Sequence, residues 1–127
     1  MDDKRGLLTI QTLAMPGDTN ANGDIFGGWL VSQMDLAAGV LSKSIAKGRV
    51  ATVAINSLQF LKPVHVGDIV SCFCRLDKKG RTSMHIIVEV WTENFHMNTT
   101  THAAIGIFVF VAIDEEGNPR EVPKNIS

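Results

Sequence analysis

Asp35 is the residue of this sequence with the clearest potential for chemistry, because its carboxylate interrupts the mostly apolar stretch Ile25–Leu41. If that stretch is a helix, steps of four, three, four and three residues place small or polar residues on one narrow stripe: Gly28, Ser32, Asp35, Gly39 and Ser42. Such a stripe can face water, or it can form a seam against which another backbone packs closely. It can also hold a functional carboxylate, and the spacing alone leaves the three interpretations open.

The start of the same stretch offers a complementary group. Asp24 is a residue type that caps helices, and after it Phe26, Gly27 and Gly28 are expected to present amide N–H groups that no earlier helical turn satisfies. Two of these residues lack a side chain, so a polarised carbonyl oxygen can approach the amides. Hydrolysis of an acyl group needs such a helix end together with an isolated carboxylate, which acts as a nucleophile or as a base toward water.

The separation of these two groups predicts a site shared between chains. Gly28 and Asp35 are seven residues apart in the sequence, which is roughly 10 Å along a helix axis. Both groups must lie about 3 Å from one reacting carbon. One helix therefore cannot supply both parts of one site, whereas two helices from neighbouring copies can.

Hydropathy patterns predict the elements that position these groups. A strand over Leu7–Met15 ends at Pro16, and a polar loop with Asn20 and Asn22 leads into a helix from Ile25 to about Ala46. Four segments rich in β-branched residues follow, and we predict them to be strands: Val50–Pro63, Val66–Leu76, Thr82–Glu93 and Ala103–Ile113. The second and third of these read as a hairpin, and alternation in the third places four apolar residues on one face: Met84, Ile86, Val88 and Val90. A polar loop is expected at Asn94–His102, and the tail after about residue 115 is expected to be irregular.

This order of elements indicates an α+β fold in one domain over residues 1–127. The helix is apolar around most of its circumference, so the economical arrangement is an antiparallel sheet of five strands wrapped around one long central helix. The last two predicted strands are also apolar on their second faces, and exposed strand edges favour pairing with another chain. We therefore expect the chain to form at least a dimer.

Composition limits the partners and the compartment. The formal net charge of the 127 residues is -1, which provides no field for gathering nucleic acid or coating a membrane. Cys72 and Cys74 are spaced like residues on one face of a strand, and we interpret them as reduced core thiols. The first residues carry no long apolar run typical of a signal peptide or a membrane span, and we expect a cytoplasmic protein.

Other chemistries have weaker support in the sequence. The segment GDIFGG lacks the GxGxxG spacing of dinucleotide-binding loops, and no GxSxG motif marks a serine nucleophile. The histidines show no spacing typical of metal ligands, so we expect no metal site: His65, His85, His96 and His102.

Three blocks of the sequence resemble a known family: MPGDTNANGDIFGGWLVSQMDLAAG, FLKPVHVGDIV and GRTSMHIIVEVW. With these blocks the chain is similar to the hotdog-fold acyl-CoA thioesterases, specifically the bacterial YciA type, from Leu7 to about Val122. The resemblance implies the hotdog fold, dimers that associate into a trimer of dimers, and hydrolysis of acyl-CoA to a free acid and coenzyme A. The CoA thioester is then the substrate, and no cofactor is implied.

The resemblance also implies roles for individual residues. Asp35 would be the catalytic carboxylate, and the segment from Asp24 to Gly28 of the facing subunit, which includes Gly27, would bind the thioester carbonyl. We further expect substrate or CoA contacts from the polar loop, the helix start, the end of the strand Val50–Pro63 and the turn of the predicted hairpin: Asn20, Asn22, Phe26, Lys62, Arg81, Thr82 and Ser83.

Two other functions remain open from the sequence. A non-catalytic module that binds acyl-CoA or an acyl carrier could use the same groove. A dehydratase of the same fold would pair a histidine with its acid near the helix, and no histidine occurs between Asp24 and Ala46. A thioesterase assay separates these possibilities.

Overall fold

The computed structural model describes residues 4–124 and contains one long helix and one antiparallel sheet. The helix α1 spans Gly27–Ala46, and a short 3-10 helix, η1, spans Pro16–Asp18. The strands are β1 (Leu7–Leu13), β2 (Val50–Phe60), β3 (Ile69–Lys79), β4 (Ser83–Asn94) and β5 (Thr99–Ala112). They lie in the order β1-β3-β4-β5-β2 with every neighbouring pair antiparallel. The predicted arrangement of one helix on a five-stranded sheet is therefore confirmed.

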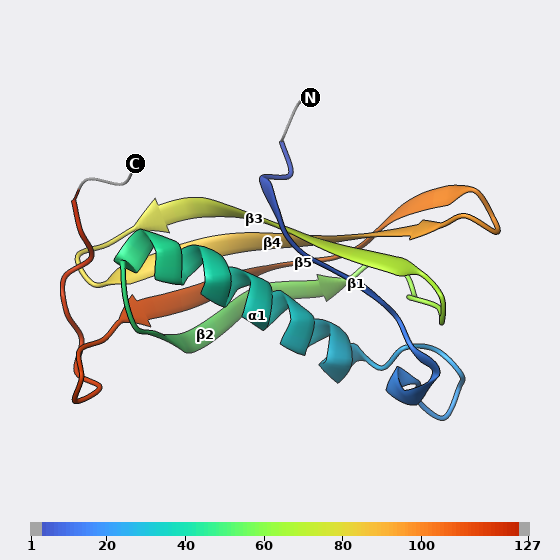
Figure 1. The fold of residues 1–127 in the computed structure, drawn as a ribbon, viewed down its shortest axis with the longest axis horizontal. Helices are drawn as coiled ribbons and strands as arrows, with labels where there is room; N and C mark the ends of the chain where they lie inside the picture. Colours follow the sequence, from blue (N-terminus) through green and yellow to red (C-terminus); the bar gives the residue numbers. More distant parts are fainter. Residues whose placement is uncertain (1–3, 125–127) are drawn as a thin grey trace.

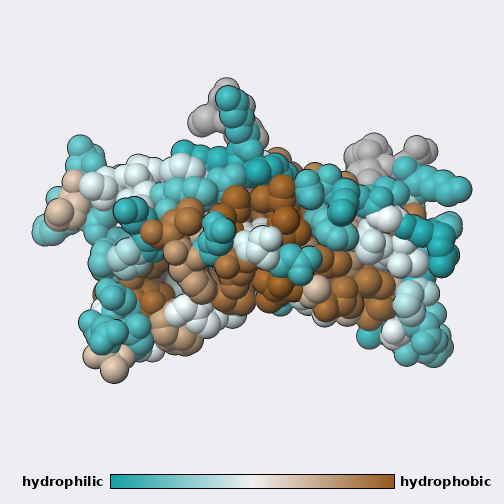
Figure 2. Space-filling view, turned by 180° about the vertical axis from the view of Figure 1, so that it is seen from behind, coloured by the Kyte–Doolittle hydropathy of each residue, from teal (hydrophilic) through white to brown (hydrophobic). Residues whose placement is uncertain are grey.

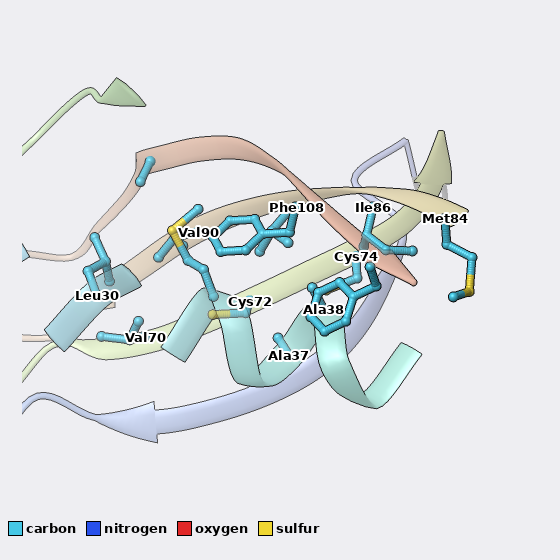
Figure 3. Packing of buried hydrophobic residues seen from close by; sticks show 14 of the residues in the cluster. Leu30, Ala37, Ala38, Val70, Cys72, Cys74, Met84, Ile86, Val90 and Phe108 are labelled. Atoms are coloured by element: carbon cyan, nitrogen blue, oxygen red, sulfur yellow. The ribbon is translucent and has the colours of Figure 1, made fainter. Parts of the chain in front are cut away.

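The core lies between α1 and the face of the sheet that α1 crosses (Figure 1). The alternation predicted for the fourth strand is confirmed, since four side chains on one face of β4 are fully buried: Met84, Ile86, Val88 and Val90. Phe108 from β5 and Ala37 and Ala38 from α1 complete the packing (Figure 3). Small residues on α1 let the helix pack close to the sheet. This close packing fixes the position of the helix side that faces away from the sheet.

Two predicted boundaries are wrong. The segment Asn94–His102 is mostly paired, because β4 continues to Asn94, β5 begins at Thr99, and the turn uses Asn98 with φ 54°. Threonines in that segment read as loop residues, but their β-branched side chains also suit a strand. The helix begins at Gly27 rather than Ile25, because the Ile25 amide donates to the carbonyl of Val64 and holds that residue in an extended bridge.

Cys72 and Cys74 are free and buried on β3, as predicted. Burial raises the pKa of Cys72 to about 12 and that of Cys74 to about 11. Both thiols therefore stay protonated near pH 8, and the reactive thiolate is scarce.

We expect iodoacetamide at pH 8 to label the two cysteines only as fast as the protein unfolds. Mass spectrometry of the native protein over time, beside a sample in denaturant that labels at both positions, makes the comparison. Rapid modification of the native protein would contradict the buried positions.

The second face of the sheet has no covering element in residues 4–124, and apolar side chains gather on it (Figure 2). Ile87, Ile105 and Ile107 alternate along β4 and β5 with residues of the core. Glu89 stands among them: burial works to raise its pKa, but hydrogen bonds from Arg75 and Trp91 outweigh this and lower the pKa. Because the Glu89 carboxylate already has hydrogen bonds within the chain, covering this face with another molecule costs less desolvation free energy than burying an unpaired charge.

Candidate functional site

Asp35 lies on the side of α1 that faces away from the core, and its carboxylate has one protein partner. The Oδ1 atom accepts a hydrogen bond of 2.8 Å from the hydroxyl of Thr52. Thr52 pairs with the buried Phe110 of β5, which directs its side chain toward the helix side of the sheet. A hydroxyl on a strand therefore orients the carboxylate on the helix and leaves Oδ2 without a hydrogen bond among the described residues.

The stripe predicted on the helix changes its surroundings along its length. Gly28 and Ser32 are exposed, Asp35 is half-buried, and Ser42 is fully buried with its hydroxyl donating to the carbonyl of Gly39. The stripe is therefore neither a uniform solvated face nor a uniform packing seam. Asp35 stands at the transition between the two.

The helix start differs from the prediction in two ways. Phe26, not Asp24, is the N-cap residue, and no side chain caps the helix. The Phe26 amide donates to the carbonyl of Asp18 and is not free. The amides of Gly27 and Gly28 have no hydrogen-bond partner among residues 4–124, so two amides at the positive end of the helix remain available to an acceptor.

The polar loop before the helix is ordered by Asn20. Its side-chain oxygen accepts from the amides of Asn22 and Asp24, and its own amide donates to the carbonyl of Asp24. These bonds use the backbone of Asp24 in a turn, which explains why this residue does not cap the helix. The Asp24 carboxylate instead lies 3.6 Å from Nδ1 of His65, a residue that no sequence pattern had linked to the site.

A cavity of about 350 Å³ adjoins the helix start. Its polar lining includes Asn20, Asp24 and Lys62, and the ring of Phe60 closes it beside Gly27. The structure therefore brings together four of the predicted site residues at one end of the helix: Asn20, Asp24, Gly27 and Lys62. A polar group that approaches the free amides enters through this cavity.

The remaining predicted residues are not brought to this cavity within one chain. Asp35 lies two helical turns away and does not line it. Arg81, Thr82 and Ser83 lie at the opposite end of the sheet, where the Thr82 carbonyl accepts from Ala112 at the end of β5. Arg81 lies 3.9 Å from Glu121 of the tail. One chain therefore holds the parts of the site in separate places.

Within residues 4–124, no group of three or more histidine, cysteine, aspartate or glutamate side chains is placed to hold a metal ion. In the same range, no helix is long and apolar enough to cross a membrane.

Comparison with known proteins adds the family. The model of the thioesterase superfamily matches residues 22–95. The acyl-CoA thioester hydrolase YciA of Escherichia coli is 50% identical over 122 residues, which cover 94% of this chain and 92% of that protein.

Two solved structures are also very similar. The hexameric thioesterase y2039 of Yersinia pestis has a TM-score of 0.91 at 49% identity, covering 94% of this chain and 98% of that one. HI0827, a hexameric broad specificity acyl-coenzyme A thioesterase, has a TM-score of 0.92 at 47% identity, covering 94% and 88%. The chain belongs to the thioesterase superfamily, and within it to the hotdog-fold acyl-CoA thioesterases of the YciA type.

Proposed function

We propose that this protein hydrolyses acyl-CoA thioesters to a free acid and coenzyme A. The observation that carries the proposal is the isolated Asp35 carboxylate, held by Thr52 on the open side of the helix, in a chain about half identical to acyl-CoA thioester hydrolases. The direct test is an assay of thiol release across acyl-CoAs of increasing chain length. Binding without thiol release would favour the alternative of a non-catalytic acyl-CoA-binding module.

The chemistry follows from the two parts of the site. The thioester carbonyl oxygen accepts hydrogen bonds from the Gly27 and Gly28 amides, which stabilise the negative charge that develops on it. Asp35 of a second chain either attacks the carbonyl carbon or removes a proton from the attacking water. On either route the carbon–sulfur bond breaks, and the CoA thiolate leaves and takes up a proton. If Asp35 attacks, the acyl group is left as an anhydride on its carboxylate, and water then hydrolyses this anhydride and restores Asp35. If water attacks, the free acid forms directly and carries the oxygen of that water.

This scheme needs no cofactor. The carboxylate supplies the nucleophile or the base, and the two amides bind the carbonyl oxygen of the thioester. We further propose a cytoplasmic location, because the two cysteines on neighbouring inward positions of β3 are free thiols.

A second copy of the chain is expected to cover the surface around Asp35. Leu36 and Val40 on α1 are 59% and 51% exposed, and Val53 and Ile55 on the edge strand β2 are exposed beside them. Apolar side chains at an unpaired strand edge favour association. We propose a dimer through this surface, which brings Asp35 of one chain to the helix start of the other. We also propose that three such dimers form a hexamer, and the two similar structures are hexameric.

We predict that no stable monomer exists at micromolar concentration, because the shared surface is too apolar to remain in water. Analytical ultracentrifugation measures the mass directly. A folded species of 13.8 kDa under these conditions would contradict both the dimer and the shared site.

Contacts to coenzyme A are proposed on both sides of the site. Asn20, Asn22 and Phe26 lie on the loop and helix start, and Lys62 lines the adjoining cavity. Arg81, Thr82 and Ser83 would reach the same substrate from a neighbouring chain, where the Arg81 guanidinium suits a phosphate.

The pair formed by His65 and Asp24 resembles the histidine and acid that a dehydratase of this fold would place near the helix. The structure supplies a histidine next to an acid near the helix, although none is close in the sequence. The two side chains are 58% and 46% exposed, and 3.6 Å between Nδ1 and Oδ1 is too long for a hydrogen bond. Hydrolysis remains the proposed reaction, and an assay of enoyl-CoA hydration beside the thiol assay separates the two.

A further inference from the structure

The hexamer proposed above requires a second contact surface on each chain. The dimer uses α1 and the edge strand β2, so contacts between dimers must use another part of the molecule. The second face of the sheet has no cover within residues 4–124 and carries apolar side chains (Figure 2): Phe73, Ile87, Ile105 and Ile107. An apolar face of this kind is typical of an interface. A second copy is the expected occupant, because the similar structures are hexameric.

A stack of three side chains lies on this face. The Arg5 guanidinium lies 3.8 Å from the centre of the Trp91 ring, and the His102 ring stacks on Trp91 at 4.5 Å with the planes 4° apart. Arg5 also lies over Phe73 of β3, whereas His102 belongs to β5. The two groups therefore approach Trp91 of β4 from opposite sides, and both contact its aromatic ring.

Glu89 is the acid beside this stack. Its carboxylate accepts hydrogen bonds from Arg75 at 2.7 Å and from the Trp91 indole at 3.0 Å. Arg75 also donates to the carbonyl of Arg5, which ties the segment before β1 to the same cluster. Burial works against ionisation, but the two hydrogen bonds to the carboxylate lower the pKa of Glu89. Glu89 therefore stays charged throughout the pH range in which histidines titrate.

His102 has a nitrogen without a partner next to this carboxylate. Its Nε2 atom lies 3.4 Å from Oε1 of Glu89, is buried, and makes no hydrogen bond within residues 4–124. The side chain of His102 keeps 28% of its surface exposed. Another chain over this face would remove the remaining water from the ring, and a protonated ring would then lose its solvation.

The charges around His102 balance only while its ring is neutral. The charged groups come from β3, β4 and the segment before β1: Arg5, Arg75, Glu89 and Glu93. On the other side of β5, β2 contains no charged residue, and Lys62 after it lines the cavity at the helix start. The arginines offset the glutamates, so protonation of His102 adds a positive charge without a counterion. It also places cations on both sides of Trp91.

Association through this face is therefore expected to depend on pH. In a free dimer, water solvates the protonated ring of His102, whereas a covered face favours the neutral ring. The assembled form consequently binds fewer protons than the free dimers do. Association then weakens as the pH falls through the range near about 6.5 in which histidines titrate.

We propose that dimers meet through the second face of the sheet around Glu89 and His102, and that protonation of His102 separates the hexamer into dimers. The hexamer is the form at about pH 7.5 and the dimer is the form at about pH 5.5. Each dimer keeps both parts of the proposed site, because Asp35 lies on α1, across the core from this face. The inference rests on the proposed hexamer and not on thioester hydrolysis.

Sedimentation velocity at micromolar concentration, from about pH 8 to about pH 5.5, tests the proposal. The parent is expected to change from hexamer to dimer, with the concentration for half-assembly rising at least about tenfold. In His102→Gln the side chain takes up no proton, but its amide can still donate to Glu89. For this variant the same concentration is expected to change by less than about twofold over that range.

Two further variants separate the role of His102 from other causes. His85→Gln removes a second histidine of the same face, which lies opposite Val109 and Lys78 and away from Glu89. This variant is expected to separate at the same pH as the parent. Ile107→Lys places a permanent charge on the face and is expected to be a dimer at every pH. Circular dichroism and thermal unfolding of each variant, compared with the parent at the same pH, show whether the fold is intact.

Each outcome supports or overturns the proposal. A parent that stays hexameric at the lowest pH, or that is already a dimer at the highest, would overturn it. So would a His102→Gln variant that separates as the parent does, a shift caused by His85→Gln instead, or normal assembly of Ile107→Lys. If His102→Gln does not fold, His102→Phe keeps a ring stacked on Trp91 without a titrating group and makes the same comparison. The masses do not depend on turnover, so the result stands even if the chain hydrolyses no acyl-CoA.

Discussion

Replacement of Asp35 by asparagine is expected to lower kcat for acyl-CoA hydrolysis by about a thousandfold, the range typical for loss of a general base or an attacking carboxylate. Asparagine keeps the shape of the side chain and an oxygen that can accept the Thr52 hydrogen bond. The fold and the binding of substrate should therefore remain close to those of the parent. Steady-state kinetics, with circular dichroism and CoA titration as controls, measures these effects.

The variant Thr52→Val serves as the graded comparison. It keeps Asp35 ionisable but removes the hydroxyl that orients it, and loss of a hydrogen bond to a charged group costs roughly 1.5–3 kcal/mol. We expect kcat to fall by about ten- to a hundredfold, less than for Asp35→Asn. If Asp35→Asn left the rate within a few-fold of the parent, Asp35 would be an ordinary polar residue on a helix stripe.

Activity is expected to return when two inactive variants are refolded together. Asp35→Ala lacks the carboxylate, and Gly28→Val blocks the approach to the helix amides. A side chain at Gly28 meets only the ring of Phe26, at 3.2 Å, and that ring is exposed and can move. The second variant is therefore expected to fold.

Random pairing makes about half of the dimers mixed, and one of the two sites in a mixed dimer then combines an intact Asp35 with an intact Gly28. About a quarter of the parental activity should reappear in the thiol-release assay. If each site were built within one chain, every site would carry one defect and no activity would return. Native mass spectrometry of the mixture establishes that mixed dimers have formed, so that absence of recovery would refute the shared site.

The sequence permitted correct predictions where residue types repeat with the period of a strand or of a helix. The alternation in β4 identified its buried face, because a strand directs successive side chains to opposite sides. The spacing of small residues placed Gly28 and Ser32 on one side of α1, and both are exposed. Both features depend only on local geometry, so they can be read without knowing the neighbours of the segment.

The errors arose where contacts between distant segments outweighed local preference. Asp24 has the residue type of a helix cap, but the Asn20 side chain holds its backbone in a turn, and the amide of Ile25 pairs with Val64. The threonines of the β4–β5 connection have a polar character that favours a loop, yet they pair across the hairpin. Local propensity is a weak constraint when hydrogen bonds from another part of the chain compete with it.

The sequence by itself placed Asp35 on a stripe of small and polar residues along one helix and predicted amides without partners at the start of that helix. It also determined that the two are too far apart to act on one carbon. Only the tertiary structure decided what surrounds them: Thr52 beside Asp35, His65 beside Asp24, and the cavity that adjoins the helix start. These partners come from strands and loops distant in the sequence, and their positions depend on strand register, which a shift of one residue would reverse.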